Sequence, residues 1–143
     1  MKDKEAIYSL SLTDFEYYCD HLFGLSISRA LSRTGYPYFT YIAISEDGSV
    51  YKIGRSHNPI RRAKSFKGGY RAFNFKILYF IDHDIELELL SALDMSGAKT
   101  PLWVNPNGKR HREAFWLKKS DISYIVNKFG FKPISEFAPY GNG

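Results

Sequence analysis

The stretch TYIAISEDGSVYKIGRSHNPIRR, residues 40–62, predicts a β-hairpin that leads into a helix. Asp47 and Gly48 lie between two apolar runs, and Asp-Gly in that setting is the strongest short-range hairpin signal, because a type I′ turn needs positive φ at both central residues. The turn predicts these facing pairs: Ser45 with Val50, Ile44 with Tyr51, Ala43 with Lys52, Ile42 with Ile53, and Tyr41 with Gly54.

This pairing gives the hairpin two chemically different faces, because directly paired residues share a face. One face is apolar and predicts a core: Ile42, Ile44, Tyr51 and Ile53. The other face gathers a phenol, a small side chain, an ammonium group and bare backbone: Tyr41, Ala43, Lys52 and Gly54. We expect Gly54 to leave the phenol of Tyr41 uncovered. A slip of one residue would bury Lys52, so the apolar pattern opposes it.

The helix after the hairpin is expected to run from Asn58 or Pro59 to about residue 67. At 100° per residue, Arg62 lies at the edge of its apolar stripe and can reach the face of Tyr41, whereas Arg61 points to solvent or to a phosphate farther along a strand. Simpler interpretations stay open. Tyr41 can fill a strand face, Lys52 can be solvated, and Arg62 can snorkel at a core margin.

The charge of the chain is concentrated in one stretch. The net charge is +5, yet residues 48–81 carry eight lysines and arginines, no acidic residue and several aromatics. This predicts an anionic partner such as a nucleic acid, with a solvated basic face as the alternative. The single Cys19 and four scattered histidines indicate no cysteine-built or zinc site. The start shows no signal pattern and no apolar run suggests a membrane span, so a cytoplasmic protein is expected.

The whole chain predicts a small α+β domain. Residues 1–36 are expected to form an amphipathic helical extension, and the order after residue 37 is β-β-α-β-α-β-α. We expect a mainly antiparallel sheet of three to four strands flanked by helices over residues 37–133, followed by a tail at 134–143. The predicted helix ends are Thr13 or Asp14 and Gly24 in the extension, Asp82 or Asp84 before residues 85–95, and Ser120 and Gly130 around the last helix.

One carboxylate stands on the apolar side of a predicted helix. In DIELELLSALDM, residues 84–95, Glu86 projects into the apolar stripe, whereas Glu88 projects away from it. Burial of an unpaired carboxylate is costly, so we expect Glu86 to be paired, protonated or bound to a cation. An exposed place in the first helical turn, where the helix dipole favours negative charge, is the alternative. An error of one residue in helix phase would exchange Glu86 and Glu88.

Taken in order, these segments resemble the GIY-YIG endonuclease superfamily, closest to its phage-associated branch with a KIG second motif. The resemblance covers about residues 38–130 and is carried by TYIAI, by YKIGRSHNPIRR, by a helix with an inward Glu, and by REAFWLKKSDI. It implies a nuclease that hydrolyses DNA phosphodiesters with one divalent metal, Mg²⁺ or Mn²⁺. RNA is the alternative substrate. Residues 1–36 would then offer a surface for a protein partner or a dimer.

The resemblance also implies roles for individual residues. Tyr41 would help to activate the attacking water, Arg62 would stabilise the phosphorane charge, and Glu86, with Glu88 as the alternative, would bind the metal. Lys52 would accept a proton or bind phosphate, while Gly54 and Glu113 would be structural. This site requires the phenol of Tyr41 and the carboxyl of Glu86 to share a pocket with Arg62. Nucleic-acid contacts are predicted at Arg55, His57, Arg61, Lys64, Lys67, Arg71, Lys109 and Arg110.

The chain departs from the family pattern in three places. Phe39 and Thr40 replace Gly-Ile, Lys52 stands where most relatives have tyrosine, and no histidine follows Glu86 at Leu90 or Ala92. A catalytically degenerate nucleic-acid-binding or protein-binding module is therefore the rival function.

Overall fold

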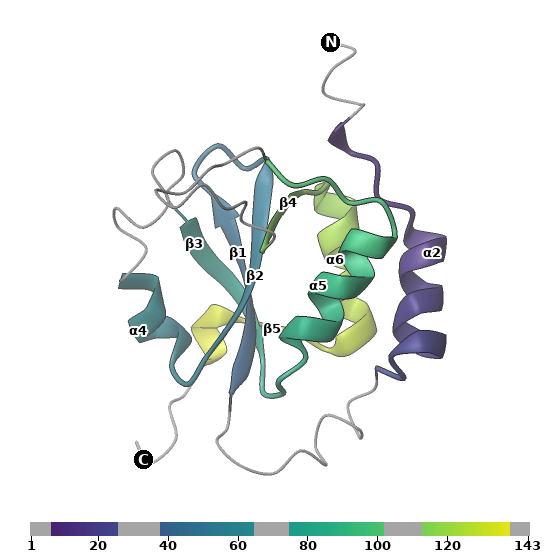
Figure 1. Cartoon of the computed structure of the whole chain (residues 1–143). Coiled ribbons are helices and arrows are strands. Elements are labelled where there is room, and N and C mark those ends of the chain that lie inside the picture. Colours follow the sequence, from purple (N-terminus) through teal and green to yellow (C-terminus); the bar gives the residue numbers. More distant parts are fainter. Residues whose placement is uncertain (1–6, 26–37, 65–74, 102–112, 138–143) are drawn as a thin grey trace, which may run out of the picture.

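The computed structural model describes residues 7–25, 38–64, 75–101 and 113–137. These ranges form an α+β fold around one antiparallel sheet in the strand order β4-β2-β1-β3-β5 (Figure 1). The strands are β1 (Phe39–Ser45), β2 (Val50–Ser56), β3 (Phe75–Ile81), β4 (Ala114–Trp116) and β5 (Lys132–Pro133). The helices are α2 (Leu12–Tyr17), the π-helix η1 (Tyr18–Leu22), α4 (Pro59–Lys64), α5 (Glu86–Met95), α6 (Lys119–Phe129) and the 3₁₀-helix η2 (Ile134–Glu136). The predicted fold class is confirmed, and the short β5 adds an unpredicted fifth strand.

The hairpin register is confirmed, but the predicted turn type is wrong. β1 and β2 pair Tyr41 with Gly54, Ile42 with Ile53, Ala43 with Lys52 and Ile44 with Tyr51. Among the described residues positive φ occurs only at glycines, so Asp47 cannot occupy a type I′ turn, although Gly48 has φ 81°. Instead the Asp47 carboxylate accepts hydrogen bonds from the hydroxyl of Ser45 at 2.7 Å and from the backbone N–H of Ser49 at 3.0 Å. Side-chain bonding of this kind closes a longer loop without changing the register.

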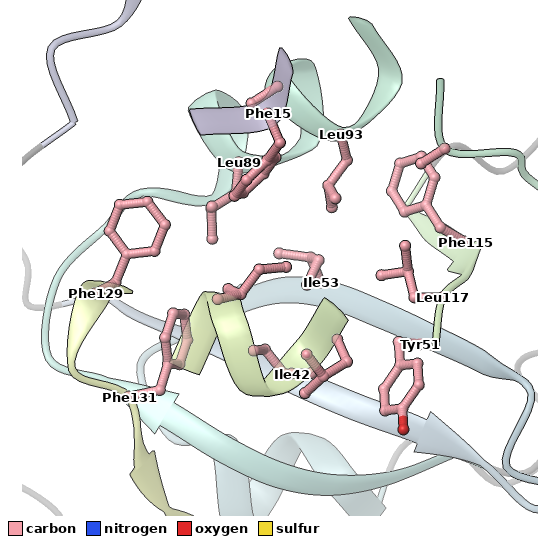
Figure 2. Packing of buried hydrophobic residues seen from close by; sticks show 14 of the residues in the cluster. Phe15, Ile42, Tyr51, Ile53, Leu89, Leu93, Phe115, Leu117, Phe129 and Phe131 are labelled. Atoms are coloured by element: carbon pink, nitrogen blue, oxygen red, sulfur yellow. The ribbon is translucent and has the colours of Figure 1, made fainter. Parts of the chain in front are cut away.

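The main core lies between one face of the sheet and three helices. Ile42, Ile53 and Tyr51 of the hairpin contribute to the same buried cluster as Leu89 and Leu93 of α5. Figure 2 shows these side chains gathered with Phe15 of α2, Phe115 of β4, Phe129 of α6 and Phe131 just after α6. The predicted apolar face of the hairpin is therefore the core face.

The N-terminal extension is part of this core. Phe15 and Cys19 are fully buried in the main cluster, and burial raises the pKa of the Cys19 thiol to about 12. The backbone N–H of Ser11 donates to the carbonyl of Ser96 at 2.9 Å, which joins the extension to the end of α5. The cap of α2 is Ser11, whose hydroxyl accepts from the N–H of Asp14, so the prediction of Thr13 or Asp14 is wrong. The weaker helical pattern at residues 26–35 lies outside the described residues.

Of the two ends predicted for α6, the start is wrong and the stop is confirmed. α6 begins after Lys118, whose backbone N–H donates to the Asp121 carboxylate at 2.9 Å, so Ser120 is not the cap. The C-terminal stop at Gly130 is confirmed, with φ 79° and a hydrogen bond from its N–H to the carbonyl of Val126. Within the described ranges, no helix combines the length and apolarity that a membrane span requires.

The second face of the sheet carries a smaller apolar cluster. It contains Tyr41, Ala43, Val50, Phe75, Ile77 and Ala114, with Trp116 and Ile134 packed against it. Figure 1 shows α4 on the side of the sheet away from α5. This face is therefore closed over much of its area, and Lys52, which shares the face with Tyr41, is only 2% exposed.

Candidate functional site

Two ion-paired groups of charged side chains, drawn from three chain segments, lie along β2. We call them the edge cluster: Lys52, Arg55, Asp84, Glu86 and Glu113. Lys52 and Arg55 come from β2, Asp84 and Glu86 stand at the start of α5, and Glu113 directly precedes β4. With two cations and three carboxylates the cluster carries a formal excess of one negative charge. Such a mixture of charges can present cations to a phosphate.

Lys52 is a buried cation held by a carboxylate. Its side chain is 2% exposed, and Nζ lies 2.9 Å from Oε1 of Glu113, which is 43% exposed. Nζ also lies 6.0 Å from the ring centroid of Tyr41, at the outer limit of a cation–π contact. An ammonium group is kept away from water only when charged or polar partners compensate it. Glu113 therefore compensates the buried charge of Lys52, and its predicted structural role stays a prediction.

Arg55 connects the cluster to the start of α5. Its NH1 atom lies 3.0 Å from the Asp84 carboxylate, and Nε lies 3.9 Å from Oε1 of Glu86. Its guanidinium also lies 4.5 Å from the ring centroid of Tyr38. Three contacts hold this long side chain in one place, although nearly half of it remains exposed.

The surroundings of Glu86 shift the pKa of its carboxyl group. Burial raises its pKa above the ordinary value, and repulsion from Glu113 raises it further, whereas Lys52 and Arg55 lower it. These couplings show that the groups of the cluster act on one another electrostatically. The side chain of Glu86 is 13% exposed, as its predicted inward orientation requires, but Oε1 of Glu88 is buried too, so the predicted outward orientation of Glu88 is wrong.

A buried threonine places the start of α5. The hydroxyl of Thr40 donates to the carbonyl of His83 at 2.6 Å and accepts from the N–H of Ile85 at 2.9 Å. Thr40 is fully buried and pairs with Arg55 in the hairpin. This contact from β1 replaces the caps predicted at Asp82 or Asp84 and holds Glu86 opposite Arg55.

The expected exposure of Tyr41 is wrong. Its side chain is 1% exposed and lies in the second apolar cluster with Ala43 and Ile77. The ring lies across Gly54, where an added Cβ would stand only 2.8 Å from Cε2 and still nearer to Cζ. The missing Cβ at Gly54 lets the ring fold down onto β2 instead of projecting into a pocket. The condition that the Tyr41 phenol faces a shared pocket is therefore not met.

The remaining predicted residues divide into two groups. Arg61 is exposed on α4, and the ring of His57 stacks on Tyr38 with centroids 4.1 Å apart. The side chains of the others lie outside the described part of the chain: Arg62, Lys64, Lys67, Arg71, Lys109 and Arg110.

Sequence reasoning missed three residues of this region: Tyr38, Thr40 as a helix anchor, and Asp84 as an ion-pair partner. The hairpin register contains the signal for two of them. Continued past Tyr41 with Gly54, it sets Thr40 opposite Arg55, as observed, and Tyr38 opposite His57. Asp84 had no such signal, because its contact with Arg55 depends on how α5 is placed.

The metal prediction stays a prediction. Within the described ranges no group of three or more His, Cys, Asp or Glu side chains could hold a metal ion. Glu86 is the glutamate found beside Arg55, but this contact does not decide between Glu86 and Glu88 as a ligand.

Comparison with known protein families corrects the resemblance. Residues 35–130 match the family model of the T5orf172 domain, which is a different family from GIY-YIG. No significant match was found among curated proteins or among solved structures. The assignment to the GIY-YIG superfamily is therefore wrong, and the short motifs that carried it do not identify the family.

The matched segment contains the whole sheet apart from β5, together with all five residues of the edge cluster. It leaves out α2 and η1, although these helices complete the main core. The T5orf172 domain is phage-associated and nuclease-like or DNA-binding, which is compatible with a nucleic-acid-binding or endonuclease role. Because the match covers well over half of the sequence, the chain belongs to the T5orf172 domain family.

Proposed function

We propose that this protein is a metal-dependent endonuclease that hydrolyses DNA phosphodiester bonds at the edge cluster. The observation that carries the proposal is the half-buried carboxylate of Glu86, which lies 3.9 Å from Arg55 and has its pKa raised by burial and by Glu113. Perturbed carboxylates next to cations are common at catalytic sites. Membership in a nuclease-like family supports the same activity.

Glu86 fits a magnesium or manganese site of the open kind. Mg²⁺ usually keeps several waters and takes only one or two protein carboxylates, so a cage of three protein ligands is not required. Glu86 would hold the ion, and the excess negative charge of the cluster would favour it, while Glu88 remains the alternative ligand. When bound, such an ion polarises a phosphoryl oxygen and lowers the pKa of its water.

Arg55 would bind the scissile phosphate. It contacts the Asp84 carboxylate in the structure and is 43% exposed, so a phosphate would exchange with Asp84 for this donor, whereas the buried Lys52 would act on the phosphate through its charge alone. Preset cations offset the charge that grows in the transition state. Arg62 of α4 is proposed as a further cation. Tyr41 is left out as the group that activates water, because its buried ring is out of reach of a substrate.

Nicking of supercoiled plasmid in Mg²⁺ or Mn²⁺ tests this proposal. Glu86→Gln keeps the size of the side chain, and we expect it to lower the nicking rate by roughly 100-fold or more, because it removes the metal-binding charge. Arg62→Ala should also lower the rate. Glu46→Gln, which changes an exposed carboxylate in the hairpin loop, is the matched control and should nick at the parental rate. Parental protein that does not nick, or an unchanged Glu86→Gln rate, would refute the proposal.

A nucleic-acid-binding module without hydrolysis is the second candidate. It is favoured by the buried Tyr41 and by the carboxylate partners of Lys52 and Arg55. Its expected result is DNA or RNA binding that weakens steeply with salt, as phosphate neutralisation requires, without any nicking. A flat salt response would contradict both candidates.

A further inference from the structure

An exposed π-stack adjoins the edge cluster. The rings of Tyr38 and His57 lie 4.1 Å apart between centroids with an interplanar angle of 27°. The guanidinium of Arg55 lies 4.5 Å from the centroid of the same Tyr38 ring. His57 is exposed, the Arg55 side chain is 43% exposed, and Tyr38 is half-buried. We call these three residues the Tyr38 stack.

The stack and the charged site share one residue. Arg55 contacts Tyr38 and, through NH1, the carboxylate of Asp84 at 3.0 Å. A ligand that places a phosphate on Arg55 would therefore find the aromatic surface of the Tyr38 stack within one side-chain length of that phosphate. In a nucleotide, the group found at that distance from the phosphate is the base.

Every nucleobase has a π-face that stacks on exposed aromatic side chains and on arginine planes. Bases inside a duplex cover one another's faces, so only an unpaired base can use such a surface. We propose that the Tyr38 stack binds an unpaired nucleobase next to the phosphodiester held at the edge cluster. This deepens the proposed function and rests on it, since it makes single-stranded or locally unpaired DNA the preferred substrate.

The chain contains a matched control. Tyr17 and His21 form a second stack, with centroids 4.8 Å apart and an interplanar angle of 14°, and Tyr17 is 51% exposed. This pair belongs to α2 and η1, which lie on the side of α5 away from β2 (Figure 1). Both stacks pair a tyrosine with a histidine, but only the Tyr38 stack includes Arg55 and adjoins the edge cluster.

Binding in EDTA, which prevents metal-dependent cleavage, tests the proposal. The probes are a 5′-fluorescein-labelled oligothymidylate, the same strand fully paired with oligoadenylate, and an abasic strand of equal length, all followed by fluorescence anisotropy. Tyr38→Leu should raise the Kd for oligothymidylate about 5- to 100-fold, the range found when one base–aromatic stack is removed. Its Kd for the duplex and for the abasic strand should change by less than about twofold.

Three further variants sharpen the result. Tyr38→Phe keeps the ring and should bind oligothymidylate as the parent does, and so should Tyr17→Leu. His57→Ala alters an exposed residue and should weaken oligothymidylate binding in the same selective way. If circular dichroism shows that Tyr38→Leu is unfolded, His57→Ala tests the proposal in its place.

The proposal is overturned if Tyr38→Leu binds oligothymidylate as tightly as the parent, or if it loses equal affinity for all three probes. Equal losses from Tyr17→Leu and Tyr38→Leu overturn it too. Plasmid nicking is scored separately. A parent that nicks but shows no Tyr38-dependent preference refutes the stack alone, whereas a parent that binds strands through Tyr38 and never nicks refutes hydrolysis alone.

Discussion

The two faces of the β1–β2 hairpin share one backbone register but meet different surroundings. On the first face Ile42 and Ile53 lie in a cluster that draws helices from both ends of the described chain. On the second face a smaller apolar cluster stands beside the buried ammonium group of Lys52. A buried charge contributes little to stability compared with an apolar side chain of similar size. The comparison therefore assigns most of the apolar burial to the first face and a paired buried charge to the second, while Arg55 and Glu86 lie where the first face meets the start of α5.

The largest expected effect tests whether the extension belongs to the first face. Phe15→Ala should lower the free energy of unfolding by about 3–5 kcal/mol, because it removes a fully buried ring from the main cluster. Urea denaturation measures this change. Tyr17→Ala alters an exposed ring of the same helix and should cost far less. A small loss from Phe15→Ala would mean that α2 is an appendage and not part of the core.

The next effect tests the close contact on the second face. Gly54→Ala should cost roughly 2 kcal/mol of stability, because the new Cβ collides with the ring of Tyr41. Thermal denaturation of the single variants and of Gly54→Ala with Tyr41→Leu forms a double-mutant cycle. The two changes should be strongly coupled. Additive losses would show that the ring of Tyr41 does not lie on Gly54.

A smaller effect concerns the hydrogen bond that joins β1 to the start of α5. Thr40→Val keeps the shape of the side chain but leaves the N–H of Ile85 without its hydroxyl acceptor, and we expect a loss of about 1–2 kcal/mol. Thr40→Ser should keep most of the stability. If Thr40 also positions Glu86, Thr40→Val should slow plasmid nicking and Thr40→Ser should restore it. Equal behaviour of both variants would remove Thr40 from this role.

The smallest effect is the pH dependence caused by Glu86. Its pKa is raised in the folded protein, so the folded state binds the proton more tightly than the unfolded state does. Proton binding by Glu86 therefore adds to the free energy of unfolding below the ordinary pKa. This stabilisation is lost as pH rises through the raised pKa of the folded state. At neutral pH Glu86→Gln should be slightly more stable than the parent, and the difference should shrink as pH falls through this window. Urea titrations between pH 4 and pH 8 measure it, and a difference independent of pH would contradict the assigned shift.

The parts of the fold that were predictable depend on short-range patterns. Alternating apolar residues around Asp47 and Gly48 were enough for the register, even though the turn itself is different. Gly130 ends α6 as predicted, because its left-handed conformation is a local property. The predicted caps of α2 and α6 were wrong, since several Ser, Thr and Asp residues compete near each helix start. The predicted cap of α5 was wrong because Thr40, a residue of β1, makes the contact at its start.

Family membership was the least predictable property. The motifs resembled one nuclease superfamily, whereas residues 35–130 match another family. Short motifs with a few departures, such as Phe39 and Thr40 in place of Gly-Ile, sample too few positions to separate the two. The match over the whole domain uses many more positions.

The sequence by itself determined the strand pairing, the core face, the concentration of positive charge and the inward orientation of Glu86. These follow from periodicity and local turn chemistry, which act over a few residues. Only the tertiary structure decided that Tyr41 is buried on Gly54 and that Arg55 and Asp84, 29 residues apart, form an ion pair. Contacts of that kind depend on where α5 and β4 settle against β2, and the burial of the whole core sets those positions.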